Sequence, residues 1–196
     1  MTKIMQQRSV YMMSKKVGMM VANGYEEVEM LTVVDLLRRA GMTCDIISVT
    51  GGKELTSSHK VTVIADLLYE EADFGCYDAL VIPGGMPGTT NLGQHEGVCG
   101  QLKKAYADGK LIAAICAAPT VFGKLGLLEG KKAICYPGME DQLTGAIVTY
   151  EPAVRDGNII TSRGMGTAID FGLEILAYYE GRDEAAAMAE KVVYEA

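Results

Sequence analysis

The stretch K-L-I-A-A-I-C-A-A-P, residues 110–119, decides the fold that we predict for this chain. Its apolar run from Leu111 to Ile115 is long enough for a fully buried parallel strand and too short for a helix. Pro119 favours the first turn of a helix, which we expect over Pro119 to Leu125. A tight turn must therefore place Cys116 at the carboxyl end of a strand, where open α/β sheets bind ligands.

Cys116 has two interpretations at that position. A thiol beside the positive end of a helix is biased toward the thiolate, which is the nucleophilic form. Alternatively, Cys116 is one more small buried apolar residue, as most free cysteines are. The turn by itself leaves both interpretations open.

Short apolar runs alternate with amphipathic segments over the rest of the chain. We expect strands over residues 17–21, 43–49, 60–64, 79–82, 111–115 and 133–135, and a hairpin over 154–161 around R-D-G-N. We expect helices over residues 26–40, 91–107, 119–125, 168–179 and 183–194, and irregular structure over 69–77. This alternation predicts an α/β protein, a flavodoxin-like three-layer α/β/α sandwich with a mainly parallel sheet.

The length of 196 residues indicates one domain of ordinary size, over residues 17–196. Residues 1–16 hold four basic residues and no acidic one, and we expect a disordered or artificially added extension there. No apolar run approaches the length of a membrane span, so we expect no membrane association.

Charge and cysteine content exclude several classes of site. The net charge of -7 argues against a nucleic-acid partner, because nucleic-acid binders usually carry a basic face. The five cysteines are odd in number and contain no C-x-x-C pair, so they indicate neither a disulfide framework nor a zinc site. We therefore expect no metal and a reducing compartment, the cytoplasm.

An acidic residue faces inward in the helix that begins at Glu26. Glu29 shares a helix face with Val33 and Leu36, whereas Glu26 and Glu27 can be explained as solvated first-turn acids. A buried carboxylate costs several kcal/mol unless it is hydrogen-bonded or protonated, so Glu29 is a candidate for a raised pKa. The alternative is that Glu29 bends back to cap its own helix.

The run P-G-G-M-P-G, residues 83–88, follows the strand expected over 79–82. The adjacent Gly84 and Gly85 let backbone N–H groups face outward, which is what an oxyanion needs. A plain turn would use the same residue types.

Four such turns lie at expected strand ends. They are G-Y-E-E-V-E at 24–29, P-G-G at 83–85, A-I-C-A-A-P at 114–119 and T-S-R-G at 161–164. Together they resemble the ThiJ/PfpI superfamily, specifically its DJ-one (parkinsonism-associated) branch, and the similarity runs from Val17 to about Val193.

The resemblance implies roles for individual residues. Cys116 is similar to the nucleophilic and oxidisable cysteine of the family, and Glu29 matches the carboxylic acid that shares a proton with its sulfur. Arg163 matches a structural arginine near this pocket. The backbone N–H donors around the pocket are matched by Gly84, Gly85 and Ala117.

The chain departs from the family pattern in its histidines. Many members keep a histidine beside the cysteine, but Ala117 and Tyr136 occupy the matching positions here. His95 is expected on the surface of a helix, and His59 lies in a hairpin that approaches the neighbouring pocket in related dimers. A Cys-His-acid protease is not expected, and whether His59 or Tyr136 replaces the absent base stays open.

The resemblance implies a cofactor-free glyoxalase or deglycase that acts on small 2-oxoaldehydes such as methylglyoxal and their protein adducts. A protonated Glu29 would lower the thiol pKa of Cys116 and favour the thiolate. Alternatively, the same thiolate serves an oxidative-stress sensor or protective chaperone by becoming a sulfinic acid. An unrelated amidase or biosynthetic accessory role is a third possibility. A homodimer is implied in each case.

Overall fold

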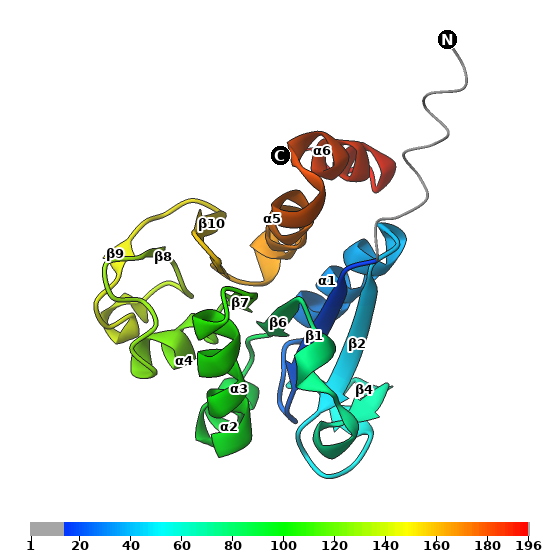
Figure 1. Ribbon diagram of the computed structural model, residues 1–196, viewed down its shortest axis with the longest axis vertical. Helices are drawn as coiled ribbons and strands as arrows, with labels where there is room; N and C mark the ends of the chain where they lie inside the picture. The colour runs from blue at the N-terminus through cyan, green and yellow to red at the C-terminus, as the bar shows by residue number, and fades with distance from the viewer. Residues whose placement is uncertain (1–13, 196) are drawn as a thin grey trace.

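The computed structural model describes residues 14–195 and contains a seven-stranded sheet between two helical layers (Figure 1). The strand order is β10-β11-β7-β6-β1-β2-β5, and only the β10–β11 pair is antiparallel. This topology confirms the predicted α/β sandwich with a mainly parallel sheet. The strands are β1 Lys16–Val21, β2 Thr43–Ser48, β5 Leu67–Leu68, β6 Ala79–Ile82, β7 Leu111–Ile115, β10 Ala153–Asp156 and β11 Ile159–Ser162.

Two small sheets flank the main one. The antiparallel pair joins β3 Glu54–Thr56 to β4 Thr62–Ile64, and the parallel pair joins β8 Lys132–Ala133 to β9 Ile147–Val148. The 60–64 strand expected from the sequence is thus shorter than predicted and belongs to a hairpin. The strand expected over 133–135 pairs only at its start.

Both faces of the sheet are covered because the central strands are apolar on both sides. All residues of β6 and β7 are buried. One face packs against α1 Glu27–Arg39, α5 Ala168–Glu180 and α6 Arg182–Lys191. The other packs against α2 Gly88–Gln94, α3 Glu96–Ala107 and α4 Pro119–Lys124 (Figure 1).

His95 breaks the helix that the sequence predicts over 91–107. Its backbone is extended, so α2 ends and α3 begins there, and its imidazole Nδ1 accepts a hydrogen bond from Val98 N–H at 3.1 Å. The ring nitrogen gives a partner to one of the backbone N–H groups that are unpaired at the start of a helix, which compensates for the interruption between α2 and α3. His95 is therefore a half-buried capping residue rather than the surface helix residue that we expected.

Short 3-10 turns occupy parts of the connecting segments, including the segment 69–77 that we expected to be irregular. They span Tyr69–Glu71, Phe74–Cys76, Glu140–Gln142 and Met165–Thr167.

The amino-terminal boundary differs slightly from the prediction. Residues 1–13 of the expected extension lie outside the described residues, and β1 begins at Lys16, one residue before the strand expected over 17–21. Within residues 14–195, no helix has the length and apolarity to cross a bilayer.

Gly123 lies where α4, the helix that follows Cys116, packs closely against the backbone of residues 142–144. A Cβ at Gly123 would overlap the backbone carbonyl oxygen of Gln142 and lie 2.9 Å from Thr144 N. We expect Gly123→Ala to lower the free energy of unfolding by about 2 kcal/mol, because backbone atoms cannot move aside as a side chain can. Urea unfolding measures this change.

Gly100→Ala in α3 is the matched control. A Cβ there meets nothing within 4 Å, so this substitution should stabilise the protein by up to about 1 kcal/mol through helix propensity. Equal stability of Gly123→Ala and the wild type would contradict the close approach.

Candidate active site

The carboxyl ends of four neighbouring strands bring the quoted turns together. Strands β11, β7, β6 and β1 are adjacent and parallel, so the segments that follow them meet at one edge of the sheet. The turns identified in the sequence therefore surround one place, and Cys116 lies in the middle of them.

The backbone of Cys116 is held in the left-handed region, with φ at 64°. Its N–H donates to Ser162 O at 3.0 Å, and its carbonyl oxygen accepts from Tyr136 N–H at 2.7 Å. A non-glycine residue in this region costs on the order of 1–3 kcal/mol and persists only where neighbouring contacts enforce it. These two bonds tie Cys116 to the end of β11 and to the segment that follows β8. Cys116 is half-buried, whereas Cys44 and Cys135 are buried.

Glu29 reaches the same place from the first turn of α1. Its side chain is only 1% exposed, and its Oε2 accepts the Gly84 N–H at 2.9 Å. The inward orientation predicted from helical spacing is confirmed, and the alternative that Glu29 caps its own helix is wrong. The other carboxyl oxygen, Oε1, is buried and has no hydrogen-bond partner among the described residues.

Burial raises the pKa of the Glu29 carboxyl to about 7, which is the direction that the sequence indicated. The nearby Cys116 thiol and the hydrogen bond from Gly84 N–H oppose this rise, and the negative charge of Glu26 adds to it. The carboxyl therefore exchanges its proton near neutral pH, which suits a group that accepts and returns protons.

The Cys116 thiol differs from the prediction. Burial raises its pKa to about 12, and the charge and hydrogen bond of an ionised Glu29 act in the same direction. The N–H groups of Ala117 and Gly85 lower this pKa but do not outweigh the other causes. A carboxylate beside the sulfur disfavours a second negative charge, so this contribution belongs to the ionised Glu29, and the lowering expected from a protonated Glu29 stays a prediction.

Gly84 brings the two reactive groups close together. A Cβ at this position would lie 2.5 Å from Cys116 Cβ and 2.6 Å from Glu29 Oε2. Because its N–H donates to Glu29, Gly84 is not one of the free donors of the pocket, which corrects the sequence-based assignment. Gly85 and Ala117 are the donors that face the sulfur.

Tyr136 lies at the mouth of this site. A Cβ at Gly164 would lie 3.5 Å from Tyr136 Cδ2 and 4.0 Å from Cys116 Sγ, so the ring and the sulfur border the same space. The Tyr136 side chain is 51% exposed. Arg163 is half-buried and makes no hydrogen bond or ion pair with another residue of 14–195, so these contacts do not support its expected structural role.

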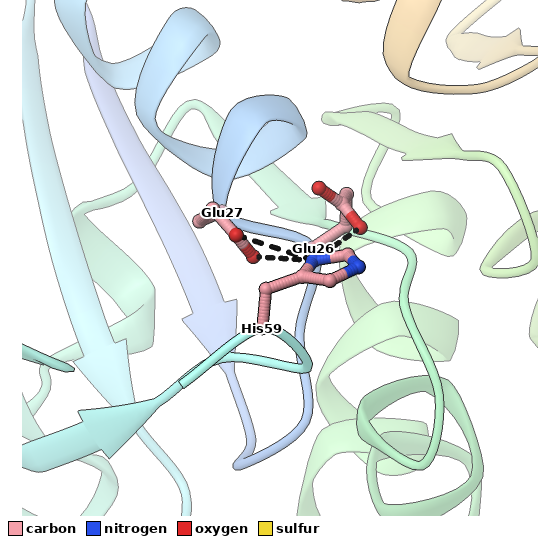
Figure 2. Close-up of side chains that lie close together, drawn as sticks. All are labelled: Glu26, Glu27 and His59. Carbon is pink, nitrogen blue, oxygen red and sulfur yellow. Dashed lines mark hydrogen bonds and ion pairs between the residues drawn. The ribbon is translucent and has the colours of Figure 1, made fainter. Parts of the chain in front are cut away.

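His59 contacts acids at the start of α1. Its Nδ1 lies 3.2 Å from Glu27 Oε1 and 3.6 Å from Glu26 Oε2 (Figure 2). These carboxylates are 15% and 14% exposed, so the expectation that they are solvated is wrong. The sequence signal for this cluster was the acidic run itself, but nothing in it indicated His59 as the partner.

A model of the DJ-1/PfpI family matches residues 15–178 of the chain. The chain belongs to the DJ-1/PfpI family. Protein dj-1beta of Drosophila melanogaster is 37% identical to this DJ-1/PfpI chain over 179 residues, which cover 90% of this chain and 96% of that protein. The resemblance inferred from the four turns is confirmed.

Two further relatives of this DJ-1/PfpI protein are informative. The deglycase PH1704 of Pyrococcus horikoshii is 34% identical over 151 residues, covering 76% of this chain and 89% of that protein. The solved structure of oxidized Toxoplasma gondii DJ-1 has a TM-score of 0.90 and 35% identity, and the match covers 93% of this chain and 100% of that one.

The raised pKa of Glu29 predicts a pH-dependent change in stability. Between about pH 4.5, its ordinary pKa, and about pH 7, the folded protein retains a proton that the unfolded chain releases. Stability due to this carboxyl therefore falls as pH rises through that window. As pH rises from 4 to 8, we expect the free energy of unfolding of Glu29→Gln to increase by up to about 3 kcal/mol relative to that of the wild type.

Urea unfolding across this pH range measures the difference between the two proteins. The control is Glu54→Gln, which removes an exposed carboxyl from β3 and should follow the wild type. A constant difference between Glu29→Gln and the wild type would show that Glu29 titrates alike in folded and unfolded chains.

Proposed function

We propose that this protein is a cysteine-dependent glyoxalase or deglycase that acts on small 2-oxoaldehydes such as methylglyoxal and on their protein adducts. The observation that carries the proposal is the buried Glu29 carboxyl beside the Cys116 thiol, with a pKa near 7. The name of the Pyrococcus horikoshii relative, a deglycase, supports the same class of reaction. The reaction needs no cofactor.

The first step forms a carbon–sulfur bond. The ionised Glu29 accepts the Sγ–H proton as the sulfur attacks the aldehyde carbon, so the high pKa of the free thiol is not an obstacle. The aldehyde oxygen gains the electron pair of the carbonyl double bond, and the N–H groups of Gly85 and Ala117 are placed to hold it. Return of the proton to this oxygen yields a hemithioacetal.

The second step moves a proton between adjacent carbons. Glu29 removes the proton from the carbon that carries sulfur and delivers it to the neighbouring former ketone carbon. The hydroxyl group on the sulfur-bearing carbon loses its proton and becomes a carbonyl, while the former ketone oxygen gains a proton and becomes a hydroxyl. The product is a thioester of a 2-hydroxy acid, formed without an external oxidant. Water then cleaves the carbon–sulfur bond, releases the 2-hydroxy acid and restores the thiol.

A redox-sensing or protective role is the second candidate. The half-exposed sulfur faces the Gly85 and Ala117 N–H groups, which are suitable donors for the oxygens of a sulfinic acid. A Glu29 carboxyl that carries a proton near neutral pH would add a third donor. This geometry favours oxidation that stops on Cys116 and does not spread to other sulfur atoms.

We further propose that the protein acts as a homodimer in the cytoplasm and without nucleic acid. Exposed apolar side chains on α1 and the β3–β4 hairpin support this interface, since a paired surface would remove them from water. They are Val28, Leu31, Val61 and Ile64.

The enzymatic proposal predicts that lactate forms from methylglyoxal without glutathione and that Cys116→Ala reduces this rate to background. Glu29→Gln should lower the rate by about 100-fold or more, because it removes the proton acceptor. The wild-type rate should rise as pH rises through about 7, where Glu29 ionises. Enzymatic lactate assays at several pH values measure these effects.

Cys76→Ala is the matched control, since Cys76 is an exposed thiol outside the site. It should keep the wild-type rate. Equal lactate formation by Cys116→Ala and the wild type would rule out the cysteine mechanism.

The sensor proposal predicts a gain of two oxygen atoms on Cys116 after mild peroxide treatment. Intact mass and peptide mapping measure this gain, and Glu29→Gln should reduce it because the protonated carboxyl is lost. Oxidation that begins on exposed Met86 or Met165 would argue against selective sensing by Cys116.

A further inference from the structure

Three side chains that can ligate metals converge beside α1, outside the Cys116 site. Glu26 and Glu27 come from the start of the helix, and His59 comes from the turn of the β3–β4 hairpin, 32 residues after Glu27 (Figure 2). One donor atom from each residue lies within 4.8 Å of the other two. We propose that Glu26, Glu27 and His59 bind a divalent transition-metal ion, with Zn²⁺ as the best match.

The distances around His59 fit such an ion. Its Nδ1 lies 3.2 Å from Glu27 Oε1 and 3.6 Å from Glu26 Oε2. Zinc bonds to histidine and carboxylate atoms are about 2.0–2.2 Å long, so neighbouring ligand atoms of a tetrahedral ion are about 3.3–3.6 Å apart. Figure 2 shows both carboxylates directed at the same ring nitrogen. Small side-chain movements would bring all three donors to bonding distance.

Backbone hydrogen bonds hold the two ligand-bearing segments against each other. Ser58 N–H donates to Tyr25 O at 2.8 Å, and Ser57 N–H donates to Val61 O at 2.8 Å within the turn that carries His59. Glu26 N–H donates to Gly84 O at 2.9 Å. The ligands are thus placed by bonds that do not depend on an ion, which lowers the cost of binding one.

The charge of the cluster also favours a cation. The Glu26 and Glu27 side chains are 14% and 15% exposed, and within residues 14–195 His59 is the only ion-pair partner of either carboxylate. A neutral His59 leaves two negative charges, and a protonated His59 leaves one. A divalent ion would compensate both carboxylates, which partly buried acids require more than solvated ones.

The donor types select the class of metal. An imidazole nitrogen suits zinc and its neighbours among the transition metals better than Mg²⁺ or Ca²⁺, which prefer oxygen ligands alone. Three protein ligands leave a coordination position for water or a small molecule. The three ligands lie outside the Cys116–Glu29 pair, although the charge of Glu26 also helps to raise the pKa of Glu29. The existence of the metal site does not depend on the proposed function.

The test is a Zn²⁺ titration by calorimetry of untagged protein that carries Cys76→Ser, Cys99→Ser and Cys116→Ser, so that the thiols that are not buried do not bind the ion. We expect one saturable site per chain. His59→Ala and Glu27→Gln, each added to this background, should weaken the affinity at least tenfold. Unchanged affinity in His59→Ala, or no saturable binding to the parent protein, would overturn the proposal.

His95→Asn is the matched control. It removes the other of the two histidines, while asparagine keeps the capping interaction at the start of α3. Its Zn²⁺ affinity should equal that of the parent protein. Loss of binding only in His95→Asn would place the ion elsewhere.

Proton NMR with Co²⁺ gives an independent readout that does not require activity. With two histidines in the chain, the ring resonances of His59 should shift or broaden and those of His95 should stay in place. The spectrum also shows whether each variant is folded. Unperturbed His59 resonances at saturating Co²⁺ would contradict the site.

Discussion

The hydrogen bond from Gly84 N–H to Glu29 Oε2 is the contact on which the site depends. A buried carboxyl is costly without a partner, and this 2.9 Å bond supplies one from the turn that follows β6. The bond leaves no room for a side chain at residue 84, because a Cβ there would collide with both Glu29 and Cys116. One glycine therefore determines how closely the acid approaches the sulfur.

Two acids at the start of α1, Glu27 and Glu29, differ in chemistry because burial and hydrogen bonding act on them differently. Glu29 is enclosed, and burial raises its pKa to about 7. Burial tends to raise the pKa of Glu27, but hydrogen bonds from its own N–H, Ser57 and His59 outweigh this effect. The pKa of Glu27 is therefore lowered. Two glutamates that are two residues apart thus have pKa values shifted in opposite directions.

The fold was largely predictable from local patterns. The run Leu111 to Ile115 is a buried strand because its length and apolarity suit the centre of a parallel sheet. The inward direction of Glu29 followed from its spacing to Val33 and Leu36 along one helix face. The break at His95 was not predicted, because it depends on a ring nitrogen that accepts a backbone hydrogen bond.

The sequence by itself determined the alternation of the main strands and helices along the chain, the position of Cys116 at a strand end and the inward orientation of Glu29. Tertiary structure alone decided where the Gly84 N–H points, in which direction the thiol pKa moves and that His59 meets Glu26 and Glu27. The reason is physical. Side-chain periodicity is a property of neighbouring residues, whereas burial, charge and ligand geometry depend on distances between segments that lie far apart along the chain.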